Sequence, residues 1–146
     1  MAEGSARLTV EIVTAERHVL TTEADMVIAP ATEGVVGILP RHAPLLTGLN
    51  PGVLVLKHDG EEEPLAVAGG FLQVSKNHVL VLADTAERAE EVDEQRATEA
   101  RERAVAALEE ARRTPDGLQA EAARGALRRS LARLNVVQRR RRRTQL

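Results

Sequence analysis

His42 is the residue whose surroundings most invite a chemical interpretation, because it stands between two prolines in "GILPRHAPLL", residues 37–46. A catalytic imidazole needs a nucleophile or an orienting carboxylate beside it, and a metal-bound imidazole needs further ligands. The segment supplies neither, and the other histidines lie on separate segments. We therefore predict no catalytic and no metal-binding residue here. Two interpretations of His42 remain. It is a simple turn residue, or it belongs to a shaped surface that another protein recognises.

The chain of 146 residues contains no cysteine, which excludes disulfides, thiolate metal sites and a cysteine nucleophile. Its apolar runs fall short of the roughly 18 residues of a membrane span, and the N-terminus does not resemble a signal peptide. These features predict a protein of a reducing compartment, either cytosolic or held on the cytosolic side of a membrane by a partner.

Charge is distributed very unevenly along the chain. Residues 1–85 carry a net charge of −6, residues 86–110 carry −5, and residues 111–146 carry +9 with eleven arginines. Such a division indicates that the two ends of the chain meet different surroundings.

Residues 1–86 have the pattern of a β-domain. "RLTVEIVTA", "DMVIAPA", "GVLVLKH", "PLAVAGGFLQVS" and "HVLVLAD" are alternating or apolar runs that predict strands. "TEG", "NPG", "HDGEEEP" and "SKNH" separate them as turns, with "HDGEEEP" at a hairpin. Short, mostly antiparallel strands at this spacing predict a β-sandwich or flattened barrel. With one aromatic residue, Phe71, its core must be aliphatic.

Residues 87–146 have the pattern of two antiparallel helices, so the fold class is α+β. Alanines at 97, 100, 104, 107 and 111 lie on one helical face, and Ala123, Leu127, Leu131 and Leu134 continue the period after the break "TPDG". A face of small residues buries little apolar area, so we expect the hairpin to be weakly held and mobile. Adjacent arginines at residues 139–143 repel one another, which predicts a frayed end.

Three motifs carry a resemblance that covers nearly the whole chain: "GILPRHAPLLTGLNPG", "GGFLQV" and "ADTAERAEEVDEQRA". Together they closely resemble the epsilon subunit of bacterial F-type ATP synthase. The resemblance implies the same fold and a non-catalytic, regulatory part of the central stalk of a proton-transporting rotary complex. It implies the gamma subunit, the c-ring and the catalytic alpha/beta hexamer as partners, peripheral to the cytoplasmic face of the bacterial membrane.

The resemblance also assigns a role to the proline-bracketed segment. It implies that Pro40, Arg41, His42 and Pro44 belong to the surface that docks onto the rotor. Because proline fixes the backbone φ angle, such a loop is stiff before it binds and loses little entropy on docking. Val35 and Arg41 stand where this family often has an acidic residue and a glycine, so individual contacts to the c-ring differ.

"VDEQRA", residues 92–97, resembles the segment with which some epsilon subunits bind ATP. The resemblance implies that no cofactor is required but that ATP is a regulatory ligand, and it aligns seven residues with the nucleotide contacts: Glu87, Asp93, Arg96, Ala97, Arg103, Arg129 and Arg133. A folded hairpin also brings arginines of both helices together, in a cleft that a triphosphate would neutralise. The alternative is that these are ordinary helix ion pairs.

The basic end, residues 124–143, allows more than one partner. The resemblance implies that the second helix extends to the catalytic subunits, reaches their acidic segment and blocks ATP hydrolysis. The alternative is a free-standing regulator that binds nucleic acid through these arginines. Nucleic acid is not expected, because no aromatic side chains interleave the arginines and no nucleic-acid-binding fold is recognisable.

Overall fold

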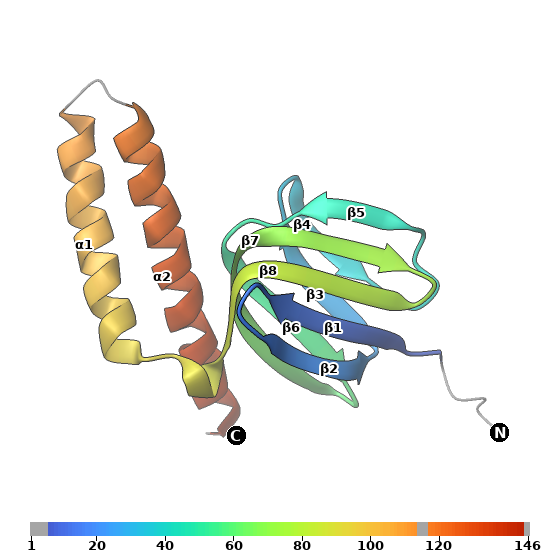
Figure 1. Cartoon of the computed structure of the whole chain (residues 1–146). Coiled ribbons are helices and arrows are strands. Elements are labelled where there is room, and N and C mark those ends of the chain that lie inside the picture. The colour runs from blue at the N-terminus through green and yellow to red at the C-terminus, as the bar shows by residue number, and fades with distance from the viewer. Residues whose placement is uncertain (1–5, 114–116, 145–146) are drawn as a thin grey trace.

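The computed structural model describes residues 6–113 and 117–144, which form eight strands, one short 3₁₀ turn and two helices (Figure 1). The strands are β1 Leu8–Thr14, β2 His18–Ala24, β3 Met26–Ala31, β4 Gly34–Ile38, β5 Leu45–Gly48, β6 Gly52–His58, β7 Glu61–Ser75 and β8 His78–Arg88. The 3₁₀ turn η1, Ala89–Glu91, leads to helices α1, Glu94–Arg112, and α2, Gly117–Thr144. The predicted order of a β-domain and a helical hairpin is confirmed.

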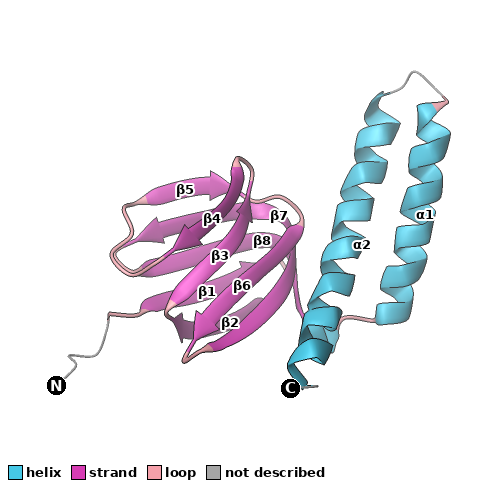
Figure 2. Ribbon diagram, turned by 180° about the vertical axis from the view of Figure 1, so that it is seen from behind, coloured by secondary structure: helices cyan, strands magenta, loops and turns pink. Residues whose placement is uncertain are grey.

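The strands form one hydrogen-bonded sheet in the order β2-β1-β8-β7-β6-β3-β4, with β5 paired to β7. Every pairing is antiparallel except that of β1 with β8. The long strand β7 pairs with β6 through Val67 and with β5 from Phe71 onward. Between them Gly69 and Gly70 adopt φ angles of +65° and +106°, which only glycine adopts readily. The sheet therefore folds over itself into the expected sandwich (Figure 2).

Two tight turns follow directly from the sequence. Asp59 and Gly60 between β6 and β7 both have positive φ, as do Lys76 and Asn77 between β7 and β8. Two-residue hairpins favour this conformation because its twist matches that of the strands. Both turns fall within predicted segments, but β7 begins at Glu61, so the acidic part of "HDGEEEP" is strand rather than loop.

The core between the layers is aliphatic, as predicted. Its largest fully buried side chains are Leu8, Ile12, Ile38, Leu54, Leu56, Leu65, Leu72, Val10, Val27, Val67, Val74 and Val79. Phe71, the single aromatic residue, is instead 59% exposed.

The sequence analysis missed three strands. β2 buries only Leu20 and Ala24 and is otherwise polar or partly exposed, so its alternation is weak. β4 and β5 have five and four residues, respectively, and contain glycine, which is typical of turns as well as of short edge strands. These strands depend on their partners in the sheet rather than on their own composition.

Helix α1 begins later than the composition suggests. β8 continues to Arg88 and η1 follows, so α1 starts only at Glu94, where the Asp93 carboxylate accepts a hydrogen bond from the Arg96 backbone N–H at 3.1 Å. Asp93 is thus the N-cap of the helix. Ala97, Ala104 and Ala111 are buried as predicted, whereas Ala107 is exposed.

On α2 the predicted leucine stripe is wrong at one position. Leu131 is 47% exposed, and Ser130 is buried in its place. The Ser130 hydroxyl donates to the Ala126 carbonyl oxygen at 2.9 Å, which satisfies the polar group inside the interface. Of the break at residues 114–117, only Gly117 lies within the described residues.

The predicted fraying of the arginine run is also wrong, because α2 continues to Thr144. Its last turns pass the start of α1 and reach back to the sandwich (Figure 1). The repulsion between neighbouring arginines is offset by carboxylates of other elements: Arg141 pairs with Glu94, and Arg143 with Glu61.

The apolar contact between the hairpin and the sandwich is small. α2 lies against the sandwich and α1 lies outside it, on α2 (Figures 1 and 2). The buried cluster at this contact consists of Ala66, Ala132 and Val136, with Val53 and Ala89 packed against it. Methyl and isopropyl groups contribute roughly 0.8 to 2 kcal/mol each. The weak attachment of the hairpin stays a prediction, and this small apolar cluster is its physical basis.

Candidate functional site

The loop between β4 and β5 holds the residues predicted to dock onto the rotor. Arg41 has φ of +68°, and its backbone N–H donates to Asn77 Oδ1 at 2.6 Å. The His42 backbone N–H donates to the Leu39 carbonyl at 3.1 Å. The first bond ties the loop to the β7–β8 turn and the second closes a turn within the loop, so its shape is fixed by the fold as well as by Pro40 and Pro44.

His42 has no partner that would activate it. Its Nδ1 lies 2.7 Å from the Ala43 carbonyl oxygen. This contact is to the backbone, and not to a nucleophile or a carboxylate. Among residues 6–113 and 117–144, no group of three His, Cys, Asp or Glu side chains could hold a metal ion. The absence of a catalytic or metal-binding role for His42 stays a prediction.

An exposed apolar surface adjoins this loop, and the sequence analysis did not identify it. Phe71 of β7 stands opposite Leu82 of β8, and Leu82 stands opposite Val13 of β1, so the three side chains share one face of the sheet. Leu46 of β5 lies on the same face and follows Pro44 by two residues. Leu46, Phe71 and Leu82 are 70%, 59% and 49% exposed, respectively. We call Leu46, Phe71, Leu82 and Val13 the apolar face.

A signal for this face was present in "GGFLQV". Leu72 and Val74 are buried, so the alternating residue Phe71 must point outward. A large aromatic side chain on the outside of a chain with no other aromatic residue indicates a contact surface.

The seven residues aligned with nucleotide contacts are only partly brought together. Asp93 and Arg96 are neighbours at the start of α1, with Arg96 Nε 3.7 Å from Asp93 Oδ2. Ala97 is buried, and Arg103 is exposed farther along α1. On α2, Arg133 donates to Glu87, and Asn135 accepts a hydrogen bond from Arg139.

Glu87 of β8 and Arg133 of α2 form an ion pair between the sandwich and the hairpin. Arg133 Nε and Nη2 both donate to Glu87 Oε1, at 3.0 and 2.7 Å. Arg129, one helical turn earlier, lines a small hollow together with Arg133, Thr85 and residues 66–68. The hollow has a volume of about 10 Å³, room for no more than a water molecule.

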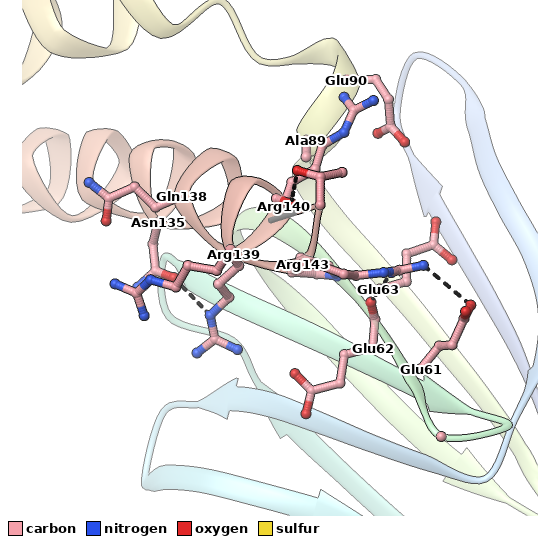
Figure 3. A pocket seen from close by; sticks show the side chains of 14 residues that line it. Glu61, Glu62, Glu63, Ala89, Glu90, Asn135, Gln138, Arg139, Arg140 and Arg143 are labelled. Carbon is pink, nitrogen blue, oxygen red and sulfur yellow. Dashed lines mark hydrogen bonds and ion pairs between the residues drawn. The ribbon is translucent and has the colours of Figure 1, made fainter. Parts of the chain in front are cut away.

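A much larger hollow, of about 940 Å³, lies elsewhere, between the β6–β7 turn and the end of α2 (Figure 3). Its charged lining consists of Glu61, Glu62, Glu63, Glu90, Arg139, Arg140, Arg142 and Arg143. None of these residues belongs to the set aligned with nucleotide contacts.

Comparison with known proteins follows the same division of the chain. The family model for the beta-sandwich domain of the ATP synthase delta/epsilon chain matches residues 7–89, and the model for the long alpha-helix domain of that chain matches residues 90–138. The chain belongs to the ATP synthase delta/epsilon chain family. The arginine run at residues 139–143 lies beyond the matched range.

Relatives in this family are similar over nearly their whole length. The ATP synthase epsilon chain of Herpetosiphon aurantiacus is 54% identical over 133 residues, covering 91% of this chain and 96% of the relative. That of Dehalococcoides mccartyi strain BAV1 is 48% identical over 141 residues, covering 97% and 99%. The predicted resemblance to the epsilon subunit, a central-stalk subunit of ATP synthase, is confirmed.

Solved structures share the fold of this epsilon-type chain. A chain in the mitochondrial ATP synthase of Euglena gracilis, a structure of OSCP, F1 and c-ring, has a TM-score of 0.71 at 22% identity, covering 88% of this chain and 81% of that chain. Neither α1 nor α2, as described, has a stretch apolar enough to span a membrane.

Proposed function

We propose that the sandwich joins the rotor of ATP synthase and that the hairpin regulates ATP hydrolysis without taking part in catalysis. The observation that carries this proposal is the contrast between two surfaces. The sandwich presents an apolar face beside a rigid loop, whereas the buried apolar cluster at its contact with the hairpin has three residues, supplemented by ion pairs. One surface suits a permanent partner, and the other suits a contact that opens and closes.

The apolar face and the loop of Pro40, Arg41, His42 and Pro44 bind the gamma subunit and the c-ring. The Euglena gracilis structure contains the c-ring together with F1, which supports this assignment. The chain then lies at the cytoplasmic face of the bacterial membrane, where it is held by the complex.

The hairpin alternates between the compact arrangement described above and an extended arrangement that reaches the catalytic alpha/beta hexamer. Compact, it permits turnover; extended, it blocks ATP hydrolysis. The five residues from Ala89 to Asp93 connect β8 to α1 and allow the change without disturbing the sheet. Antiparallel ladders that end at Arg88 keep the sandwich intact in both arrangements.

ATP is a ligand of the compact hairpin and shifts the population toward it. Arg129 and Arg133 stand one turn apart beside the same hollow, which supports a phosphate site for their guanidinium groups. In the absence of a nucleotide, Glu87 neutralises Arg133. A triphosphate that binds there must widen the hollow. The present volume of the hollow is about 10 Å³, whereas a ligand pocket typically has a volume of several hundred Å³.

Removal of the hairpin tests the regulatory role. A variant lacking residues 92–146 keeps β8 and η1, including the ion pair between Arg17 and Glu91. It should assemble into ATP synthase to the same extent as the full chain and raise the rate of ATP hydrolysis. Equal incorporation with an unchanged hydrolysis rate would remove the inhibitory role and leave the rotor role in place.

A further inference from the structure

We infer that the arginine-rich end of α2, residues 139–143, is an electrostatic latch that holds the hairpin in its compact arrangement. This inference rests on the proposed mobility of the hairpin. It assigns a role to a segment that lies outside the range matched by the family models, which ends at residue 138.

Two arginines of the run reach two different elements. Arg141 pairs with Glu94 in the first turn of α1, where Nη1 donates to Oε1 at 3.0 Å. Arg143 reaches the sandwich: Nη1 donates to the Glu62 carbonyl oxygen at 2.6 Å, and Nη2 to Glu61 Oε2 at 3.2 Å (Figure 3). The end of α2 is thus fastened both to α1 and to the strand β7.

The acceptor side of the latch is rigid. Arg7 donates to Asp59 Oδ1 at 2.6 Å, and the Asp59 backbone N–H donates to Asp25 Oδ2 at 2.9 Å, which fixes the β6–β7 turn. The pKa of Arg7 is raised, first by its hydrogen bond to Asp59 and then by the charges of Asp59 and Asp25. A guanidinium is not deprotonated in proteins, so Arg7 keeps its positive charge beside these two aspartates.

The charges of the large hollow favour a latch over a ligand site. Its charged lining consists of four glutamates and four arginines, so no bound ion is needed to neutralise it. A site for an anion would show excess positive charge instead. Figure 3 shows Arg143 of α2 reaching across the boundary to Glu61 of the sandwich, as in an interface within the chain.

The latch acts where the apolar contact is small. Exposed ion pairs contribute little individually, but here they add to a small attachment, in which the buried apolar cluster has three residues and Arg133 pairs with Glu87. They are also screened by salt, since the Debye length is about 10 Å at 0.1 M and shorter above it. The compact arrangement should therefore open as ionic strength rises.

The chain offers a matched pair of variants. Arg141→Gln with Arg143→Gln removes the two latch arginines, whereas Arg140→Gln with Arg142→Gln removes the same charge from the same turns. Neither Arg140 nor Arg142 forms an ion pair with the described residues. Because the chain has no cysteine, spin labels can be placed on Glu33→Cys and Glu102→Cys, both exposed, in the full-length protein.

The distance distribution between the labels reports the compact and open populations. The latch variant should raise the ratio of open to compact molecules about two- to tenfold, as expected for two exposed pairs, and the control should not. Arg143→Glu should open the hairpin, and Glu61→Arg added to it should restore compaction. Equal shifts in both double variants, or no shift in the latch variant, would overturn the inference. ATP hydrolysis is not measured, so the outcome is independent of whether the hairpin inhibits.

Discussion

Arg133 of α2 donates twice to a single carboxylate oxygen of Glu87, near the end of β8, at 3.0 and 2.7 Å. The two side chains are 33% and 24% exposed, less than any pair formed by the arginine run. The pair lies next to the small apolar cluster on α2, since Ala132 precedes Arg133 and Val136 follows one turn later. The ion pair therefore adds a polar contact to the apolar contact between the hairpin and the sandwich.

A double-mutant cycle should detect the coupling between Arg133 and Glu87. Arg133→Gln and Glu87→Gln should each lower the free energy of hairpin opening, obtained from amide hydrogen exchange of α2. The coupling energy should be about 0.5 to 1.5 kcal/mol, because the pair is charge-assisted and partly screened by solvent. Strictly additive effects, within about 0.3 kcal/mol, would show that the two residues act separately.

Calorimetry on the isolated chain should test nucleotide binding. ATP should give a saturable heat, and Arg129→Ala or Arg103→Ala should weaken the affinity at least about tenfold through loss of a charge-assisted contact. Arg112→Ala, which removes an exposed arginine at the end of α1, is the control of equal charge. If the unaltered chain gives no saturable heat, ATP is not its ligand.

The apolar face should be required for assembly. Phe71→Ser should weaken binding to the purified gamma subunit about 10- to 150-fold, because burying a phenylalanine side chain contributes about 1.5 to 3 kcal/mol. Leu131→Ser removes a comparably exposed apolar side chain from α2 and should leave this binding unchanged. A Phe71→Ser chain that binds gamma as tightly as the parent would exclude the face from that contact.

The bend in β7 should be intolerant of any side chain. A Cβ at Gly70 would stand 2.0 Å from the Leu82 carbonyl oxygen, with φ at +106°. Gly70→Ala should lower the free energy of unfolding in urea by about 3 kcal/mol or more, from strain and steric overlap together. Gly60→Ala is the control, because Gly60 has φ of +77° but nothing within 4 Å, so only the backbone penalty of about 1 kcal/mol is expected. Equal losses in the two variants would mean that crowding at Gly70 is relieved by movement of β8.

The sequence predicted those parts of the fold that are encoded locally. Strands such as β6 and β8 have continuous apolar runs, and their turns carry residues that accept positive φ. Short strands such as β5 cannot be predicted from their own residues, because four residues ending in glycine form a strand only when β7 supplies the partner. The outward direction of Phe71 likewise depends on which neighbours are buried.

The same distinction between local and distant contacts explains which parts of the candidate site could be predicted from the sequence. Asp93 and Arg96 are three residues apart, and their proximity follows from the helix itself. The partners of Arg133, Arg141 and Arg143 are 46, 47 and 82 positions away in the sequence. Repulsion between adjacent arginines was visible in the sequence, but the acids that offset it become neighbours only when the hairpin folds back on the sandwich.

The parallel pairing of β1 with β8 joins the first strand of the sandwich to the last. During synthesis, β1 can find only β2 until nearly ninety residues have left the ribosome, since β8 ends at Arg88. The ladder between β1 and β8 cannot form earlier, and the helices follow directly after the strand that completes it. A nascent chain halted before His78 would expose the inner surfaces of both layers to chaperones.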